Sequence, residues 1–235
     1  MNFEKTYDSP YNDTDVGLKR FMTGVYSWMT IGILLTAVIS LVMERTGAVK
    51  YLLTNGIFLI LSVLEIVLVM IFSFRVWKMS KGAATAVYLA YSALNGVTLS
   101  SIFLVYTNSS IAATFFTAAA MFGIFSIYGL LTKGDLTHWS RPLMMGLIGL
   151  IIVSIVNLFL KSDRLDWIIS IAGVVLFSLL TVYDTFKLKK LYLTYNNNND
   201  TIADDKISIW GALTLYLDFI NLFLYMLRFL GKKKN

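Results

Sequence analysis

Long apolar runs alternate with short polar stretches along almost the whole chain of 235 residues. A helix needs about 20 apolar residues to cross the ~30 Å hydrocarbon core of a bilayer. Seven segments meet this requirement, at residues 21–43, 56–74, 84–106, 111–131, 142–160, 167–187 and 208–230. The connections are short and contain the Gly, Asn, Ser and Lys residues that interrupt helices. The pattern therefore predicts an all-α integral membrane bundle of seven transmembrane helices.

Polar segments mark the limits of this bundle. We expect residues 1–20 to form a polar N-terminal tail, residues 21–230 the transmembrane domain, and residues 231–235 a basic C-terminal tail. The first 20 residues show no short apolar core with a cleavage site, so we expect the first membrane helix to direct insertion itself. Residues 188–206, with an asparagine run and three aspartates, are expected to form a solvated loop without calcium-loop spacing.

The composition agrees with a membrane protein and narrows the chemistry. Hydrophobic residues make up 57% of the chain and charged residues 14%, against roughly 25% charged in soluble domains. The chain has no cysteine, which excludes disulfides, thiol catalysis and thiolate metal sites. The single histidine, His138, lacks metal co-ligands nearby in sequence and is expected to be an interfacial loop residue. We expect neither a cofactor nor an enzymatic activity.

The net charge of +6 comes from basic residues that lie between the apolar runs and not on one face. This distribution favours topology determinants and lipid-headgroup contacts over nucleic-acid binding. With the N-terminus inside, the cytoplasmic side receives twelve basic residues and the outer loops four, which predicts a cytoplasmic N-terminus. The twelve are Lys5, Lys19, Arg20, Arg75, Lys78, Lys81, Lys133, Arg141, Lys187, Lys189, Lys190 and Lys206.

The basic C-terminal tail opposes this rule if seven helices place it outside. Either the last segment crosses fully, which we favour, or it re-enters and returns the C-terminus to the inside.

Three acidic residues lie within the predicted spans: Glu65, Asp184 and Asp218. An ionisable group in the hydrocarbon costs at least ~2.5 kcal/mol on insertion scales, so each one is a candidate for function. Glu65 occupies the middle of the second segment, where we expect it to face the bundle interior. It is either a neutral glutamic acid bonded to a neighbouring helix or part of an ion path.

The last segment carries a polar stripe. At ~100° per residue its small and polar residues share about 100° of arc, while Leu, Ile and Phe occupy the rest. We therefore expect the last helix to be central, with the stripe buried and the apolar faces turned to lipid or to leucine-rich neighbours. Interhelical hydrogen bonds worth about 0.6 kcal/mol each are the structural alternative, but a carboxylate favours function. The stripe comprises Gly211, Thr214, Asp218, Asn221, Tyr225 and Arg228.

Asp184 and Asp218 are expected to approach each other. Asp184 ends the sixth segment, about one turn deep, and Asp218 lies about seven residues, or ~10 Å, into the seventh. Two buried carboxylates cannot both ionise cheaply, so such a pair shares a proton or binds a divalent cation such as calcium. Arg75 ends the second segment and is either a counter-charge for the pair or an interfacial anchor.

The sequence of the last helix resembles a known family signature. It reads YLDFINLF at residues 216–223, preceded by Gly211-Ala212 and followed by LRF at 227–229. This is similar to the C-terminal signature of the Bax inhibitor-1 family, also called the transmembrane Bax inhibitor motif family. The resemblance covers the whole chain, because the seven segments, a glutamate in the second and a Tyr-Asp pair closing the sixth also match.

The resemblance implies a seven-helix fold with a central last helix that acts as a pH-sensitive calcium leak, with calcium as the transported ion. It implies that Asp184 and Asp218 form the pH-responsive gate, and that an arginine near Arg75, which matches only approximately, can latch it. It further implies a member of bacterial type in the inner membrane. Modulation of a membrane protease, linked to stress response, is a second role suggested for such members.

Two functions from different classes therefore remain. The first is a pH-sensitive cation leak channel gated by the aspartate pair, with Glu65, Thr214, Tyr216 and Asn221 as ion-path candidates. The second is a non-conducting interaction protein that modulates a membrane protease or a cell-death or stress regulator. An intramembrane aspartyl protease is disfavoured, because Asp218 follows Tyr-Leu instead of Gly-x-Gly and no Pro-Ala-Leu element follows it.

Overall fold

The computed structural model describes residues 10–54, 56–196 and 203–234, and these residues are almost entirely helical. Two short 3-10 helices, η1 (Val76–Lys78) and η2 (Thr137–Trp139), adjoin the longer elements. The α-helices are α1 (Pro10–Arg45), α2 (Ala48–Thr54), α3 (Ile57–Arg75), α4 (Lys81–Leu99), α5 (Ile102–Val105), α6 (Asn108–Leu131), α7 (Ser140–Leu160), α8 (Asp163–Asn196) and α9 (Ala203–Leu230).

Within these described residues, seven helical stretches are long and apolar enough to cross a membrane. This confirms the prediction of an all-α membrane bundle, and lipid therefore surrounds the protein. The spans are Val16–Arg45, Ile57–Lys78, Lys81–Val105, Asn108–Leu131, Thr137–Leu160, Asp163–Thr194 and Lys206–Leu230.

Two helices extend further than the apolar runs indicated. The first helix begins at Pro10, so residues 10–20 of the expected polar tail are helical; residues 1–9 lie outside the described part. The expected loop at 188–206 is largely wrong, because α8 continues to Asn196 and α9 begins at Ala203. Leu188 and Tyr192 are buried one turn apart, so an apolar face holds this extension after the lysines end the hydrophobic run.

The asparagine run falls mostly on residues 197–202. Those residues, including Asp200, lie outside the described part of the chain.

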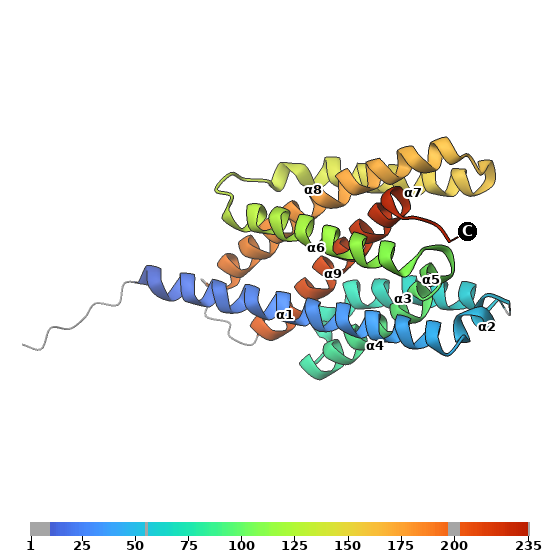
Figure 1. Ribbon diagram of the computed structural model, residues 1–235. Helices are drawn as coiled ribbons and strands as arrows, with labels where there is room; N and C mark the ends of the chain where they lie inside the picture. Colours follow the sequence, from blue (N-terminus) through green and yellow to red (C-terminus); the bar gives the residue numbers. More distant parts are fainter. Residues whose placement is uncertain (1–9, 55, 197–202, 235) are drawn as a thin grey trace, which may run out of the picture.

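The last helix occupies the centre of the bundle, as predicted. Figure 1 shows α9 running obliquely between one group of helices, α1, α3 and α4, and another, α6, α7 and α8. It packs against α1, α4, α6 and α8. In an 18-residue membrane-spanning stretch of α9, 72% of the residues are buried, compared with 6% in the span of α3 and 17% in that of α7. Thus α3 and α7 are the outer helices.

The most deeply buried side chains of α9 are apolar ones and not those of the polar stripe. Its most completely buried side chains include Leu215, Tyr216 and Leu222, whereas Asn221 of the stripe is only partly buried and Arg228 is exposed. Of the two surroundings expected for the apolar faces, lipid or leucine-rich neighbours, the structure shows neighbouring helices. Because neighbouring helices enclose α9, dense packing of its apolar side chains supplies the contacts that hold the bundle together.

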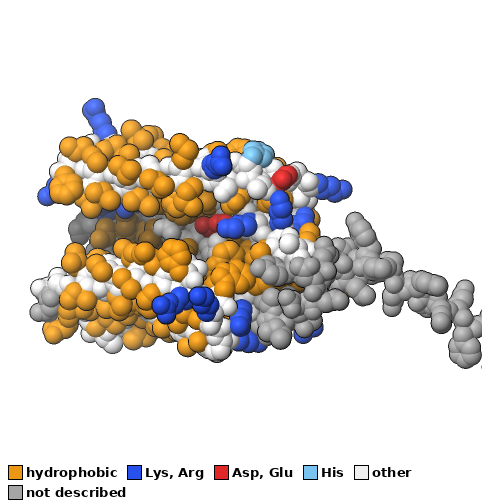
Figure 2. All heavy atoms as spheres, turned by 180° about the vertical axis from the view of Figure 1, so that it is seen from behind, with side chains coloured by type: hydrophobic (Ala, Val, Ile, Leu, Met, Phe, Trp, Pro, Cys, Tyr) orange, Lys and Arg blue, Asp and Glu red, His pale blue; other side chains and the backbone are white. Residues whose placement is uncertain are grey.

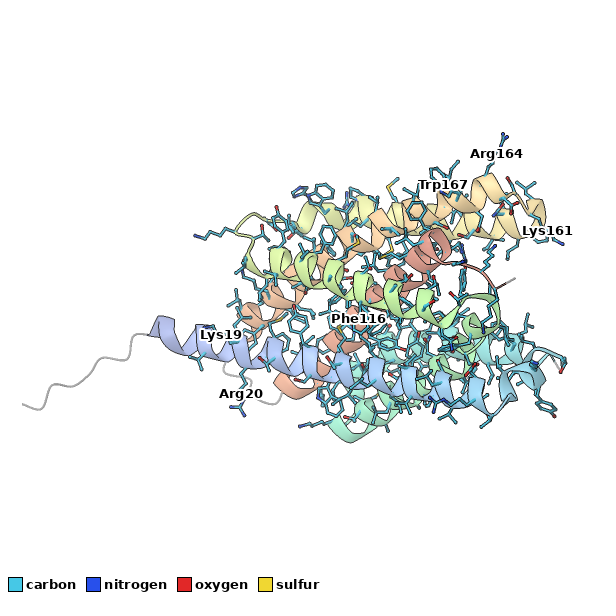
Figure 3. The ribbon with its side chains drawn as sticks, in the orientation of Figure 1. Lys19, Arg20, Phe116, Lys161, Arg164 and Trp167 are labelled. Atoms are coloured by element: carbon cyan, nitrogen blue, oxygen red, sulfur yellow. The ribbon has the colours of Figure 1, made fainter. Side chains whose placement is uncertain are left out.

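The helix ends define two ends of the molecule. Figure 3 places Lys19 and Arg20 at one end and Lys161 and Arg164 at the other. α9 is one uninterrupted helix of 28 residues that ends at the second of these. There the C-terminal segment pairs with the α5–α6 junction, through Thr107 N–H to Lys232 O at 3.0 Å and Lys234 N–H to Val105 O at 2.8 Å. The described structure therefore has the geometry of a full crossing and not of a re-entrant last segment.

Candidate functional site

Asp184 on α8 and Asp218 on α9 lie side by side in the core of the bundle. The two helices pack along each other, and the two carboxyl groups lie within hydrogen-bonding reach of one another. Asp218 is only 5% exposed. Its Oδ2 atom is buried and has no hydrogen-bond partner among the described residues. The structure thus brings together the two residues that the sequence analysis singled out as a pair.

Both helices continue well beyond the pair. α8 extends twelve residues past Asp184, to Asn196. α9 begins at Ala203, fifteen residues before Asp218. The depth of Asp184 in the bilayer, expected to be about one turn, stays a prediction.

A hydrogen bond between two carboxyl groups requires a proton on one of them. An ionised carboxylate only accepts hydrogen bonds, so one of the two groups must carry a proton to donate. Loss of that proton places two negative charges against each other. At 4 Å and an effective dielectric of 20 their repulsion is about 4 kcal/mol before relaxation. The arrangement can therefore hold one proton between two helices.

The cation that acts electrostatically on both aspartates is Lys187. Its Nζ atom also lies 5.3 Å from the ring centre of Trp210 on α9, a cation–π contact that joins the two helices. Arg75, the expected counter-charge, is exposed at the end of α3 and forms no ion pair within the described residues. Lys187 follows Asp184 by three residues and therefore lies on the same face of the helix. This spacing could have identified Lys187 as the counter-charge from the sequence.

Glu65 belongs to a different polar cluster, where α3, α4 and α9 meet. The Thr98 hydroxyl on α4 donates a hydrogen bond to Glu65 Oε1 at 2.6 Å. Tyr216 of α9 lies near this cluster, its ring centre 5.9 Å from that of Tyr91. The Tyr216 hydroxyl shares a hydrogen bond of 2.7 Å with Thr36 of α1. Glu65 is therefore bonded to a neighbouring helix, and Tyr216 turns toward it and away from the aspartate pair.

The other two ion-path candidates bond to their own helix. Thr214 Oγ1 donates to Trp210 O at 3.1 Å, and Asn221 Nδ2 donates to Leu217 O at 2.8 Å. In this arrangement their polar groups satisfy backbone carbonyls. Both residues lie on the same face of α9 as Asp218, whereas Tyr216 lies on another face and Glu65 lies on α3. The predicted path residues thus divide between two regions of the bundle.

A chain of hydroxyl groups adjoins the aspartate pair and was not anticipated. Tyr26 on α1 shares a hydrogen bond of 2.6 Å with Ser126 on α6, and Ser126 shares one of 2.9 Å with Thr185 on α8. Thr185 follows Asp184 directly and is fully buried. These residues come from three separated segments, so no spacing within the sequence reveals their contact.

Calcium at this site would need ligands beyond the aspartates. Among the described residues, no group of three or more His, Cys, Asp or Glu side chains is placed to hold a metal ion. Calcium takes six to eight oxygen ligands, and two carboxyl groups supply only part of that number. The remaining oxygens would have to come from water or backbone carbonyls, which suits an ion in transit better than a tightly held one.

Comparison with known proteins agrees with this architecture. The family model described as "Inhibitor of apoptosis-promoting Bax1" matches residues 18–235. The chain is 48% identical over 220 residues to "Inner membrane protein YbhL" of Escherichia coli strain K12, covering 93% of this chain and 94% of that one. It is 42% identical over 224 residues to an uncharacterized protein of Rickettsia prowazekii, with 94% and 93% of the two chains covered.

A more distant bacterial relative spans the same region. An uncharacterized membrane protein of Streptococcus pyogenes serotype M1 is 34% identical over 226 residues, which cover 94% of this chain and 96% of the relative. The match therefore extends over the complete membrane bundle, including both aspartates of the pair and all seven spans. This chain is a multi-pass integral membrane protein that belongs to the Bax inhibitor family.

Proposed function

We propose that this protein is a pH-sensitive cation leak channel that passes calcium, with Asp184 and Asp218 as its gate. The observation that carries the proposal is the close approach of these two carboxyl groups in the core, where Asp218 Oδ2 is buried with no hydrogen-bond partner among the described residues. A proton shared across a helix–helix contact couples pH to the packing of α8 against α9. Such a site has no structural need to be ionisable, because an amide hydrogen-bonds equally well.

The proton holds the two helices together. When it leaves, the repulsion of two buried carboxylates favours an arrangement in which α8 and α9 separate or water enters between them. A calcium ion can then replace the proton as the positive charge between the carboxylates. Lys187, on the same face of α8, limits the repulsion and is expected to adjust the pH at which the change occurs. The packed arrangement is therefore favoured at low pH and loses stability as pH rises.

The test is calcium flux into vesicles that contain the purified protein, measured across a range of pH. Asp184→Asn and Asp218→Asn should each flatten the pH dependence, because the amide keeps a hydrogen bond but cannot titrate. The double variant should add little to either single one, since the two groups act as one unit. Asp163→Asn makes the same chemical change at an exposed position of the same helix and should leave the profile unchanged.

Two outcomes separate this proposal from its alternative. If both single variants keep the wild-type pH profile, the paired-aspartate gate is wrong. If the wild-type protein gives no flux at any pH, the non-conducting interaction protein becomes the better description. The family description, which names an inhibitor of a death-promoting protein, supports that second role.

We also propose that the protein resides in a bacterial inner membrane with its N-terminus in the cytoplasm. The Escherichia coli relative, an inner membrane protein by name, supports this choice of membrane, and the excess of Lys and Arg at one end supports the orientation.

A further inference from the structure

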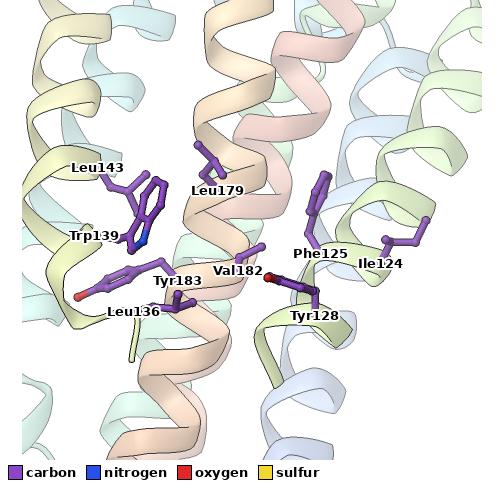
Figure 4. A pocket seen from close by; sticks show the side chains of 9 residues that line it. All are labelled: Ile124, Phe125, Tyr128, Leu136, Trp139, Leu143, Leu179, Val182 and Tyr183. Atoms are coloured by element: carbon purple, nitrogen blue, oxygen red, sulfur yellow. The ribbon is translucent and has the colours of Figure 1, made fainter. Parts of the chain in front are cut away.

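A cavity lies between α6, α7 and α8, at the end of the bundle that carries the α6–α7 connection (Figure 4). Its volume is about 400 Å³. Its walls are formed mainly by apolar side chains of all three helices, among them Phe125, Leu143, Leu179 and Val182. This volume falls in the range of small-molecule sites and suits an occupant that is largely hydrocarbon.

The cavity opens sideways, through the outer surface of the bundle. Ile124 on α6 is 66% exposed, and Tyr128 and Trp139 at the rim are also exposed. In a protein with seven membrane spans, this outer surface faces lipid. An occupant therefore reaches the cavity from the bilayer, near its boundary with water, because the polar connection at residues 132–139 lies beside the cavity.

Hydrogen-bond donors are placed around this apolar space. Tyr128, Trp139 and Tyr183 line it, and none of their polar side-chain atoms has a hydrogen-bond partner within the described residues. Figure 4 shows Tyr128 reaching from α6 toward α8, with Trp139 and Tyr183 together on the α7 side. Aromatic residues with a polar atom at one end favour the headgroup level of a bilayer.

Positive charge dominates the polar edge of the cavity. Lys190 Nζ donates to Thr137 Oγ1 at 2.8 Å and lies 3.5 Å from Asp135 Oδ1. Lys133 and Arg141 flank the same connection, are exposed and form no ion pair within the described part of the chain. Figure 2 shows the single histidine at this end, with one acidic side chain and several basic side chains around it.

Asp135 offsets only part of this charge. Hydrogen bonds from the Thr137 side chain and backbone hold the pKa of Asp135 below its usual value, so its carboxyl group stays ionised. Its Oδ1 atom already contacts Thr137 and Lys190. The polar edge therefore keeps an excess of positive charge above an apolar cavity that is open to lipid.

We infer that this cavity binds an anionic phospholipid, with an acyl chain between α6, α7 and α8 and its phosphate beside Lys190. The apolar walls exclude a free phosphate ester, which has no hydrocarbon to fill them. The excess of positive charge favours an anionic headgroup over a zwitterionic one. The tyrosine and tryptophan donors supply partners for phosphate and ester oxygens. The inference is drawn from packing and charge at the bundle surface. Lipid binding here therefore does not depend on whether the protein is a channel.

Native mass spectrometry of the purified full chain tests this inference. Mixed micelles of phosphatidylglycerol and phosphatidylcholine at equal amounts should leave phosphatidylglycerol bound in preference. Lys190→Gln should weaken that retention about fivefold, since a basic residue near a lipid headgroup contributes ~1 kcal/mol. Lys161→Gln, at the opposite end of the bundle, is the matched charge control and should leave it unchanged.

A second pair of variants tests the cavity itself. Leu179→Trp should fill it and displace the lipid, whereas Ile152→Trp places the same ring on the exposed surface of α7 and should not. Equal retention of the two lipids, or retention unaffected by Leu179→Trp in a protein that still elutes as a folded species, would overturn the inference. So would tight binding of glycerol 3-phosphate alone, because it would assign the site to a soluble anion.

Discussion

Glu65 and Asp218 are both carboxyl groups inside the bundle, but the structure gives their oxygen atoms different surroundings. Glu65 accepts a short hydrogen bond from Thr98, while one oxygen of Asp218 is buried and accepts none from the residues that the structure describes. A buried acceptor without a donor costs roughly 1–3 kcal/mol. A cost of this size at Asp218 is expected where function and not stability determines the residue, whereas Glu65 has the surroundings of a structural contact.

Glu65→Gln should therefore leave the protein folded. The amide oxygen can accept the same hydrogen bond from the Thr98 hydroxyl, so the temperature of unfolding in detergent should change little, and flux should change only modestly. Thr98→Val removes the donor and should destabilise the protein by about 1–3 kcal/mol, because the glutamate is left unpaired. Thr98→Ser keeps the hydroxyl and is the control. Loss of folded protein with Glu65→Gln would show that this carboxyl group must be charged for the bundle to form.

The contact between α6 and α8 depends on the absence of a side chain at Gly129. A methyl group built there collides with the backbone carbonyl of Val182, which cannot move aside as a flexible side chain would. This close approach also sets the spacing at which Ser126 reaches Thr185. The hydroxyl chain beside the aspartate pair is thus positioned by helix packing and not by its own hydrogen bonds alone.

We expect Gly129→Ala to destabilise the protein by about 1–3 kcal/mol, the usual range for overpacking a tight contact. Gly123→Ala is the matched control on the same helix, because nothing lies within 4 Å of a methyl group at that position. That control should be neutral or slightly stabilising, since alanine has the higher helix propensity. The free energies of unfolding of the two variants are compared by following the loss of helical structure. Equal effects at both positions would refute the close-packing account.

Hydropathy located the seven spans because lipid imposes one requirement on all of them, a length of apolar helix. It missed the helical residues before 21, which are largely polar, and those after 187, where only a buried face with Leu188 and Tyr192 is apolar. The approach of Asp184 to Asp218 was predictable because consecutive helices joined by a short connection pack together. The contacts of Glu65 with Thr98 and of Ser126 with Thr185 were not, because they depend on how each helix is rotated about its own axis, which the order of the helices does not determine.

The molecule as a whole has two ends with different charge, and this asymmetry makes its orientation testable. The chain has no cysteine, so single cysteines can be introduced without any background. Gly134→Cys lies in the α6–α7 connection and Lys50→Cys in α2, at the opposite end of the bundle. In intact cells a membrane-impermeant maleimide should label the cysteine at position 50 but not that at 134, which should react only after the membrane is opened. The reverse pattern would invert the proposed topology.

The C-terminal segment after α9 takes part in the fold at the same end as α2. Besides its backbone pairing with residues 105–107, Lys232 N–H bonds to Ser110 Oγ at 2.8 Å and Lys234 Nζ bonds to Phe103 O at 2.7 Å. An affinity tag or fluorescent protein attached directly after this segment would pull on the junction where α5 ends and α6 begins. Purification handles are therefore better placed ahead of Pro10, and a reporter at the other terminus needs a linker long enough to leave residues 232–234 in place.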